Sequence, residues 1–355
     1  LDAARERHAS DVHLQPTLEG LSVAWRMDGV LHRLGTFAAG TVTDIVTRLK
    51  VMASLLTYKN ETPQEGRIPS QDGVEMRVST FPTLHGERAT VRLFTNATSL
   101  LRLDDLGYEA DLATWIRSLL KQTSGAVLIT GPAGSGKTTT LYACLRELAT
   151  EWSTHRNSVT GVSPERRSLG ASSFRSIITM EDPIESAIDG VAQTQVHEAA
   201  GLTLATGIRS LVRQDPEVMM IGEIRDADSA QAAIAASLTG HLVLTSFHAG
   251  SCLNVLRRLR DMDLEPYMLR NGVCGIINQR LARRLCADCA EPMPAEEAQQ
   301  MWGVDARTAR TAVGCDACLR TGYSGRIVFA DWLDLRGGAF PEDVFSEQTN
   351  PSEQD

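Results

Sequence analysis

Ala126-Val-Leu-Ile-Thr-Gly131-Pro-Ala-Gly-Ser-Gly-Lys137-Thr138 carries the most informative signal in the sequence. An apolar run typical of a strand leads directly into the complete pattern G-x-x-x-x-G-K-[ST], and a helix-like run follows from Thr139 to Trp152. A strand, this loop and a helix in that order are the setting in which the pattern wraps phosphate groups. The stretch therefore predicts an α/β protein with a phosphate-binding loop for a nucleoside triphosphate.

Each part of this loop has an expected role in binding phosphate. Glycines let the backbone curl so that successive N–H groups point at phosphate oxygens, and the positive end of the following helix faces the same charge. We expect Lys137 to reach the β- and γ-phosphates of ATP and Thr138 to hold Mg²⁺. An ordinary glycine-rich turn is the alternative, and the flanking strand and helix argue against it. The residues expected to contact the nucleotide are Gly131, Pro132, Ala133, Gly134, Ser135, Gly136, Lys137, Thr138 and Thr139.

Outward from the loop, short and nearly all-apolar runs are separated by helix-like segments. Such runs are typical of parallel strands buried on both faces of a sheet. The expected strands are residues 126–130, 176–180, 218–221 and 242–246. Residues 152–174 are polar, rich in Ser and Arg and without periodicity, which favours a long surface loop.

The N-terminal part of the chain has a different pattern. Asp28-Gly29 separates two apolar runs, 21–27 and 30–34, and so predicts a β-hairpin. The apolar spacing of residues 45–56 predicts a helix. We therefore expect a second, smaller α/β domain here.

Length and composition agree with two domains. The chain has 355 residues, of which 43% are hydrophobic and 22% charged, as is ordinary for a globular protein. The expected division is residues 1–95 for the N-terminal domain, 96–106 for a linker, 107–336 for the large domain, and 337–355 for an acidic tail that we expect to be disordered.

Carboxylates follow two of the predicted strands. Glu223 comes directly after the apolar run that ends at Gly222, where enzymes of this class place a group beside Mg²⁺ and the attacking water. Glu181, Asp182 and Glu185 follow the strand at 176–180. A solvated acidic turn is the alternative interpretation of that cluster. Its position after a buried strand, at the edge where the phosphate loop must also lie, favours a functional one.

Histidines and arginines give a weaker signal. His241 and His248 flank the strand at 242–246, one at each end, and a lone histidine is more often structural than catalytic. Arg225 follows Glu223 closely. It either belongs to an exposed basic surface or is offered to a γ-phosphate, as in arginine-finger enzymes.

Four of the seven cysteines form two C-x-x-C pairs, Cys286–Cys289 and Cys315–Cys318. Such pairs can each supply half of a tetrahedral Zn²⁺ site, and four thiolates leave no open position, which predicts a structural metal. Redox-active or merely buried cysteines are the alternative. The odd number of cysteines, in a chain without an export signal, argues against a disulfide framework.

Charge and hydropathy exclude other classes of protein. The formal net charge is −9, so neither nucleic acid nor an anionic membrane surface is expected to attract the whole molecule. No run approaches the roughly 20 apolar residues of a membrane span, and no signal peptide opens the chain, so we expect a cytoplasmic protein without direct membrane insertion. Because the first residue is Leu1 rather than Met, we expect the natural protein to continue before it.

Taken together, these motifs resemble the type II secretion and type IV pilus assembly ATPases over nearly the whole chain. In the large domain, the residues after the strands at 176–180, 218–221 and 242–246 are similar to the family's aspartate box, Walker B region and histidine box. The N-terminal stretches similar to the family are Ala9-Ser-Asp11-Val-His13-Leu-Gln-Pro16, Arg26-Met-Asp28-Gly29, Gln64-Glu-Gly66-Arg67 and His85-Gly86-Glu87-Arg88.

The resemblance implies a fold and a machine. It implies a RecA-like ATPase core, a PAS-like N-terminal α/β domain and a zinc module inserted at residues 281–325. It also implies a homo-hexamer at the cytoplasmic face of the inner membrane, bound there through platform and accessory proteins of a secretion or pilus machine. The cysteine pairs favour the secretion and pilus-extension branch over pilus retraction.

The resemblance also implies roles for single residues. Glu181 becomes the general base and Glu223 the Mg²⁺-side carboxylate, two roles that can be exchanged because they rest on analogy. Lys137 and His248 complete the catalytic set, and Arg77, Arg92, Arg225 and His241 would contact the nucleotide.

Two other functions stay open at this point. A nucleic-acid translocase has the same kind of core but needs basic, aromatic-lined surfaces, and this chain has 5% aromatic residues and a negative net charge. A nucleotide-gated scaffold without hydrolysis would keep the phosphate loop and lose the carboxylates, whereas Glu181 and Glu223 are both present.

Overall fold

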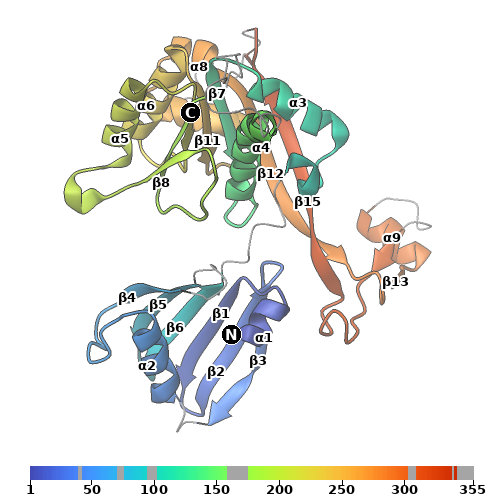
Figure 1. Cartoon of the computed structure of the whole chain (residues 1–355). Coiled ribbons are helices and arrows are strands. Elements are labelled where there is room, and N and C mark those ends of the chain that lie inside the picture. Colours follow the sequence, from blue (N-terminus) through green and yellow to red (C-terminus); the bar gives the residue numbers. More distant parts are fainter. Residues whose placement is uncertain are drawn as a thin grey trace, which may run out of the picture. The chain divides into compact units, whose positions relative to one another are not determined.

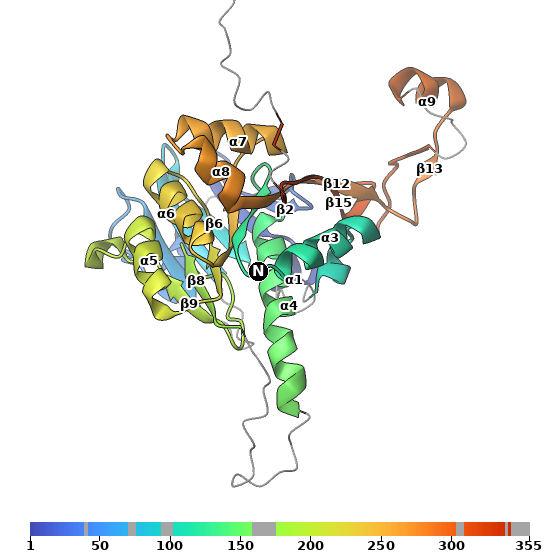
Figure 2. The same ribbon diagram turned by 90° about the horizontal axis from the view of Figure 1, so that it is seen from above.

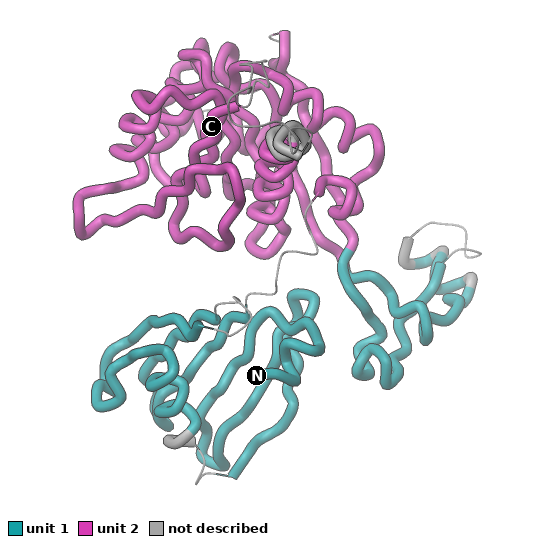
Figure 3. The backbone as a smooth tube through the Cα atoms, viewed as in Figure 1, with its two compact units in different colours: residues 1–99, 283–326 teal, residues 100–282, 327–355 magenta. Residues whose placement is uncertain are grey.

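The computed structural model describes residues 1–38, 42–69, 76–93, 102–157, 175–302, 309–337 and 340–341. The backbone divides into two compact units (Figure 3). Unit 1 comprises Leu1–Ser99 and Arg283–Arg326, and unit 2 comprises Leu100–Ala282 and Ile327–Asp355.

Unit 2 is built on a seven-stranded sheet with the strand order β15-β12-β7-β11-β10-β8-β9 (Figure 1). Its strands are β7 (Gly125–Thr130), β8 (Ile177–Glu181), β9 (Ala192–Gln195), β10 (Val218–Ile221), β11 (Leu242–Phe247), β12 (Val273–Leu285) and β15 (Tyr323–Asp334). From β12 to β9, every neighbouring pair is parallel. All residues of β7, β8, β10 and β11 are buried, which confirms the prediction of parallel strands covered on both faces.

Helices cover the two faces of this sheet. They are α3 (Ala110–Leu120), α4 (Lys137–Asn157), α5 (Leu204–Leu211), α6 (Ala227–Leu238), α7 (Cys252–Asp261) and α8 (Pro266–Gly272), with short 3-10 turns at Leu103–Leu106, Glu198–Ala200 and Val212–Gln214. One apolar cluster joins α3 and α4 to Val127, Met220 and Leu244, and the other joins α5 to α8 to Leu128 and Met219. Figure 2 shows the two groups of helices on opposite sides. Alternate residues of each strand thus pack against different helices.

Helix α4 differs from the prediction at both ends. It begins at Lys137, inside the phosphate-loop pattern, and continues to Asn157. Residues 153–157 were expected in a surface loop and are helical instead. They contain no Gly or Pro to stop a helix, and their polar side chains leave no apolar periodicity by which the sequence could reveal one. The rest of the expected loop, 158–174, lies outside the described residues.

The N-terminal part of unit 1 is a six-stranded antiparallel sheet in the order β3-β2-β1-β6-β5-β4. The strands are β1 (Asp11–Thr17), β2 (Gly20–Met27), β3 (Val30–Ala38), β4 (Gln64–Ile68), β5 (Met76–Thr83) and β6 (Gly86–Leu93), and the helices are α1 (Asp2–Glu6) and α2 (Val42–Met52). The predicted hairpin and helix are confirmed as β2–β3 and α2. Asp28 and Gly29 both have positive φ, as a tight two-residue hairpin turn requires.

The C-terminal part of unit 1 contains the four paired cysteines. Its described residues include a small antiparallel pair, β13 (Glu291–Pro292) with β14 (Arg310–Thr311), and helix α9 (Ala295–Trp302). The expected acidic tail lies outside the described residues except for Gly337, Phe340 and Pro341. Among the helices that are described, none is long and apolar enough to cross a bilayer.

Candidate nucleotide site

The loop between β7 and α4 has a backbone that only glycine can supply at key points. Gly131, Gly134 and Gly136 have φ values of +145°, +74° and +89°. A Cβ at Gly131 would lie 2.2 Å from the carbonyl oxygen of Gln279 and 2.7 Å from Ser135 Oγ. The loop is therefore pressed against β12, and its tight curl requires residues without side chains.

Gln279 of β12 holds the loop in place. Its Nε2 donates to the carbonyl of Ser135 at 2.7 Å, and its Oε1 accepts from the Tyr108 hydroxyl at 2.6 Å and from Thr140 Oγ1 at 3.1 Å. Gln279 is almost completely buried. Gln279 was not among the predicted site residues, although the polar pair Asn278-Gln279 directly after the apolar run Ile276-Ile277 was a usable signal.

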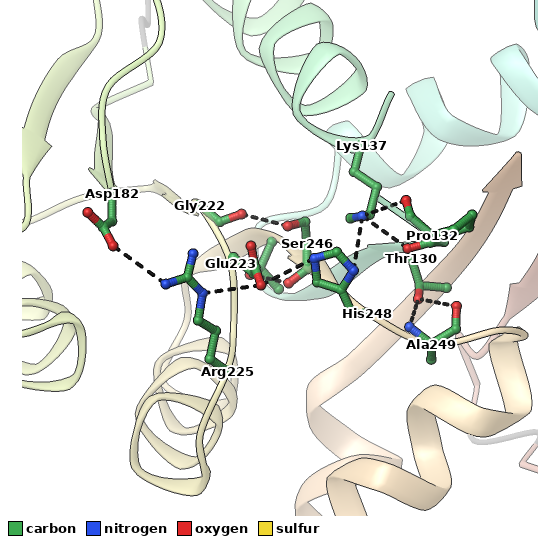
Figure 4. A network of polar contacts seen from close by, with 12 residues as sticks. Thr130, Pro132, Lys137, Asp182, Gly222, Glu223, Arg225, Ser246, His248 and Ala249 are labelled. Atoms are coloured by element: carbon green, nitrogen blue, oxygen red, sulfur yellow. Dashed lines mark hydrogen bonds and ion pairs between the residues drawn. The ribbon is translucent and has the colours of Figure 1, made fainter. Parts of the chain in front are cut away.

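Lys137 is buried in the first turn of α4 and contacts the loop itself (Figure 4). Its Nζ donates to the carbonyls of Gly131 and Pro132 at 3.0 and 3.1 Å, and lies 3.5 Å from His248 Nδ1. Burial lowers the pKa of Lys137, and the Glu223 carboxylate opposes that shift. Thr138, the expected Mg²⁺ ligand, is exposed on the next position of the same turn.

A chain of polar contacts leads from Lys137 to the ends of the neighbouring strands. His248 Nε2 lies 3.3 Å from Glu223 Oε1, and Arg225 Nε donates to the same oxygen at 3.2 Å. Arg225 also lies 3.6 Å from an oxygen of Asp182. Figure 4 shows these contacts, from Lys137 through His248 and Glu223 to Arg225 and Asp182. The structure thus brings the predicted residues Lys137, Glu223, His248 and Arg225 together.

Local hydrogen bonds fix the loops that carry these groups. Asp226 caps α6 by accepting from the Ser229 N–H at 2.7 Å, and Ser246 Oγ of β11 donates to the carbonyl of Gly222 at 2.7 Å. Thr130 and Ala249 exchange two hydrogen bonds, at 2.8 and 3.1 Å. These bonds join the carboxyl ends of β7 and β10 to the carboxyl end of β11. They involve Gly222 and Ala249, the sequence neighbours of Glu223 and His248.

Glu181 has different surroundings, because it is only 3% exposed and is held by neutral donors. Its Oε1 accepts from Thr179 Oγ1 at 2.5 Å and from Gln193 Nε2 at 3.0 Å. Its Oε2 accepts a short hydrogen bond from the hydroxyl of Tyr142, a residue of α4. Neither Gln193 nor Tyr142 was among the predicted site residues, and both reach Glu181 from other elements of the sheet and its helices.

His241 lies away from the phosphate loop. It precedes β11, whereas His248 follows it, and a strand of six residues spans roughly 20 Å. The His241 ring is instead within hydrogen-bond distance of the Ala236 carbonyl, at 2.9 Å, and of Thr239 Oγ1, at 3.2 Å. Since parallel strands all end at one edge of the sheet, only one of the two histidines can lie at that edge.

Arg77 and Arg92 are directly paired on neighbouring strands of the unit 1 sheet. Further residues pair with these two on the next strands, so that the cross-strand partners form one row on a single face of the sheet. The row consists of Arg26, Asp11, Arg92, Arg77 and Arg67. Arg92 Nε donates to Asp11 at 3.1 Å, and Arg77 pairs with Glu65 at 2.5 Å. The two predicted arginines therefore belong to a larger basic row that the sequence alone did not reveal.

The four paired cysteines form a compact cluster in which all sulfur atoms lie within 4.8 Å of one another. The Sγ pairs Cys286–Cys315 and Cys289–Cys318 are 3.9 and 3.8 Å apart. A tetrahedral Zn²⁺ with Zn–S bonds of about 2.3 Å requires sulfur atoms about 3.8 Å apart, so the cluster fits this ion. The N–H groups of Cys315 and Gly322 lower the pKa of Cys318 to about 6, which favours a metal-binding thiolate.

Comparison with known proteins agrees with this geometry. Residues 1–338 match the family described as "Type II/IV secretion system protein". The chain belongs to this family. It is 41% identical over 355 residues to the "Type II secretion system ATPase E" of Vibrio cholerae, and 41% identical over 345 residues to the "Type II secretion system protein E" of Pseudomonas aeruginosa. These alignments cover 98% and 94% of this chain but 66% and 64% of the relatives, so the chain spans less than two thirds of their length.

Solved structures share the fold at low sequence identity. The ATPase DotB of Legionella pneumophila has a TM-score of 0.62 and 22% identity, and the match covers 97% of this chain and 80% of DotB. The pilus retraction motor PilT, solved with bound ADP, has a TM-score of 0.59 and 23% identity, over 81% of this chain and 78% of PilT. These values support a common α/β fold with DotB and PilT.

Proposed function

We propose that the chain is the ATP-hydrolysing motor of a type II secretion machine or of a type IV pilus-extension machine. The observation that carries the proposal is the contact chain Lys137–His248–Glu223, which joins a phosphate-type loop to a carboxylate at the carboxyl ends of three parallel strands. Ligands of open α/β sheets bind at that edge. The relatives named as secretion ATPases support the same activity.

In this mechanism the loop 131–136 wraps the phosphates, and Lys137 leaves the loop carbonyls to neutralise phosphate charge. Thr138 would hold Mg²⁺, which would add positive charge at the β- and γ-phosphates when bound. Arg225 and the arginines Arg77 and Arg92 would supply further positive charge around the phosphates.

The contacts support exchanging the two glutamate roles that analogy implies. Among the described residues Glu223 contacts Arg225 and His248, and its side chain is 28% exposed, so water can reach the carboxylate. The three donors on Glu181 leave its buried carboxylate little capacity for a reacting water. Accordingly, Glu223 polarises the attacking water, and Glu181 anchors the end of β8.

The remaining parts of the proposal rest on the family. They are a RecA-like core over residues 107–336, a PAS-like N-terminal domain over residues 1–95, a linker at 96–106 and a structural Zn²⁺ held by the four cysteines in a module at 281–325. The working form is a homo-hexamer at the cytoplasmic face of the inner membrane, recruited by platform proteins. A non-hydrolysing scaffold is disfavoured, because the contact chain includes a solvent-accessible carboxylate.

The test is Mg²⁺-dependent ATP turnover of the full chain and of Lys137→Ala. Loss of a charge that neutralises the transferring phosphoryl group is expected to lower turnover by at least about a hundredfold. The matched control is Lys121→Ala, which removes an exposed lysine at the end of α3. Absence of Mg²⁺-dependent turnover in the unmodified chain, or full turnover in Lys137→Ala, would refute the proposal.

A further inference from the structure

Tyr142 connects the helix of the phosphate loop to the loop that follows β8. It lies in α4, four residues after Thr138 and thus on the same side of the helix. Its side chain is buried, with 4% exposure. In the proposed mechanism Tyr142 serves only as one of the donors to Glu181.

The Tyr142 hydroxyl makes three hydrogen bonds, all to residues 181–186. It donates a short hydrogen bond to Glu181 Oε2, and it accepts from the backbone N–H groups of Glu185 at 3.1 Å and Ser186 at 3.4 Å. One oxygen atom therefore fixes both ends of this short loop. Since a phenolic oxygen has one proton and two lone pairs, its hydrogen-bonding capacity is fully used.

The protonation state of the phenol suits this role. Burial raises the pKa of Tyr142, and the hydrogen bond to the Glu181 carboxylate raises it further. The hydroxyl thus remains a donor throughout the physiological pH range. Arg146, one turn further along α4, places its guanidinium 5.8 Å from the centre of the Tyr142 ring and covers it.

Gln193 of β9 supports the same loop from the other side. Its Nε2 donates to Glu181 Oε1 and to the Ser186 carbonyl, both at 3.0 Å, and its Oε1 accepts from the Ile188 N–H at 2.7 Å. The loop 181–186 is therefore held between α4 and β9. Within it lies Asp182, which contacts Arg225, the partner of Glu223.

We propose that Tyr142 is a positioning residue for ATP hydrolysis: its hydroxyl fastens the loop 181–186 to the phosphate-loop helix, and thereby sets Asp182 and Arg225 around Glu223. The inference rests on the proposed function, because it needs Glu223 at the reacting end of the nucleotide. It assigns Tyr142 a role without contact with the nucleotide. Its removal must therefore act on the rate of the reaction and leave binding of ATP unchanged.

The test compares Tyr142→Phe with Tyr267→Phe in the full chain. Both variants remove one hydroxyl, but Tyr267 is 62% exposed in α8 and serves as the matched control. The measurements are kcat and KM for ATP, the Kd of the Mg²⁺ complex of a slowly hydrolysed thiophosphate analogue of ATP, and the melting temperature. Small misplacement of groups near a reacting centre can cost up to about a hundredfold in rate.

For Tyr142→Phe we expect kcat to fall about tenfold to a hundredfold, with KM and Kd within about threefold of the unmodified chain. Tyr267→Phe is expected to match the unmodified chain. An unchanged kcat overturns the inference, and so does a parallel loss of kcat, nucleotide binding and melting temperature, which is the pattern of a merely structural residue.

If Tyr142→Phe does not fold, Gln193→Ala tests the inference in its place. It removes the second support of the loop 181–186 and leaves Tyr142 in place, so it is expected to lower kcat with KM unchanged. Full kcat in Gln193→Ala overturns the inference. Failure of the motor proposal is distinguishable, because then the unmodified chain itself shows no Mg²⁺-dependent turnover.

Discussion

The ends of β8 and β10 look alike in sequence and differ in structure. The two strands are parallel neighbours, with Met180 paired to Ile221, and each leads into a glutamate. Glu181 is buried and bound by the neutral side chains of Thr179, Gln193 and Tyr142. Glu223 is partly exposed between His248 and Arg225. The hydrogen bonds of Glu181 suit a structural role, whereas the partly exposed carboxylate of Glu223 is accessible to a reacting water.

The first consequence concerns the free energy of unfolding. Glu181→Gln places an amide N–H₂ among donors and is expected to cost about 1–3 kcal/mol, because buried hydrogen bonds to a charged group are lost. Glu223→Gln, at a partly exposed position, is expected to stay within about 0.5 kcal/mol of the unmodified chain. Urea-induced unfolding of the two variants measures both values. Equal free energies of unfolding for the two variants would contradict the structural role of Glu181.

A substitution of His248 tests the placement of the site at the carboxyl end of β10. Its ring lies between Lys137 and Glu223, so His248→Asn is expected to lower kcat about tenfold through a misplaced carboxylate. His241→Asn is the matched control, because this histidine lies at the opposite end of β11. Steady-state ATP turnover of both variants is the measurement. A larger loss in His241→Asn than in His248→Asn would contradict the placement of the site.

Thr179 tests the β8 end with the smallest expected effect. Thr179→Val keeps the shape of the side chain and removes one donor to Glu181, which is expected to cost about 1 kcal/mol of stability. Turnover is expected to remain within about twofold, since Tyr142 and Gln193 still hold the carboxylate. Thermal unfolding and turnover of the same sample give the two numbers. A loss of turnover comparable with that of His248→Asn would speak against an anchoring role of Glu181.

Local sequence predicted the parts of the fold that depend on neighbouring residues. The apolar runs gave the buried strands of unit 2 because burial on both faces requires apolar side chains at every position. The glycines of the phosphate loop were predictable for a similar reason, since the tight backbone at Gly131 excludes a Cβ. The Asp28-Gly29 turn is a third local case.

Contacts between distant parts of the chain could not be predicted in this way. Gln279 reaches Ser135 across 144 positions of sequence, and Tyr142 reaches Glu181 across 39. The basic row on the unit 1 sheet depends on the register of five strands, which no single stretch encodes. By contrast, the separation of His241 and His248 already followed from their positions at the two ends of one predicted strand. Strand order and register therefore decide which of the chemically suitable residues meet.

We propose that Glu223, and not Glu181, acts on the water that attacks the γ-phosphate. The rate of phosphate formation from a bound nucleotide, measured by rapid quench at saturating Mg²⁺–ATP, tests it directly in Glu223→Gln and Glu181→Gln. Loss of a group that assists proton transfer costs about 10²- to 10⁴-fold, so Glu223→Gln is expected to lose that much while it still binds ATP. Glu181→Gln is expected to lose only about tenfold, through the displaced loop. The reverse order of the two losses would contradict the account.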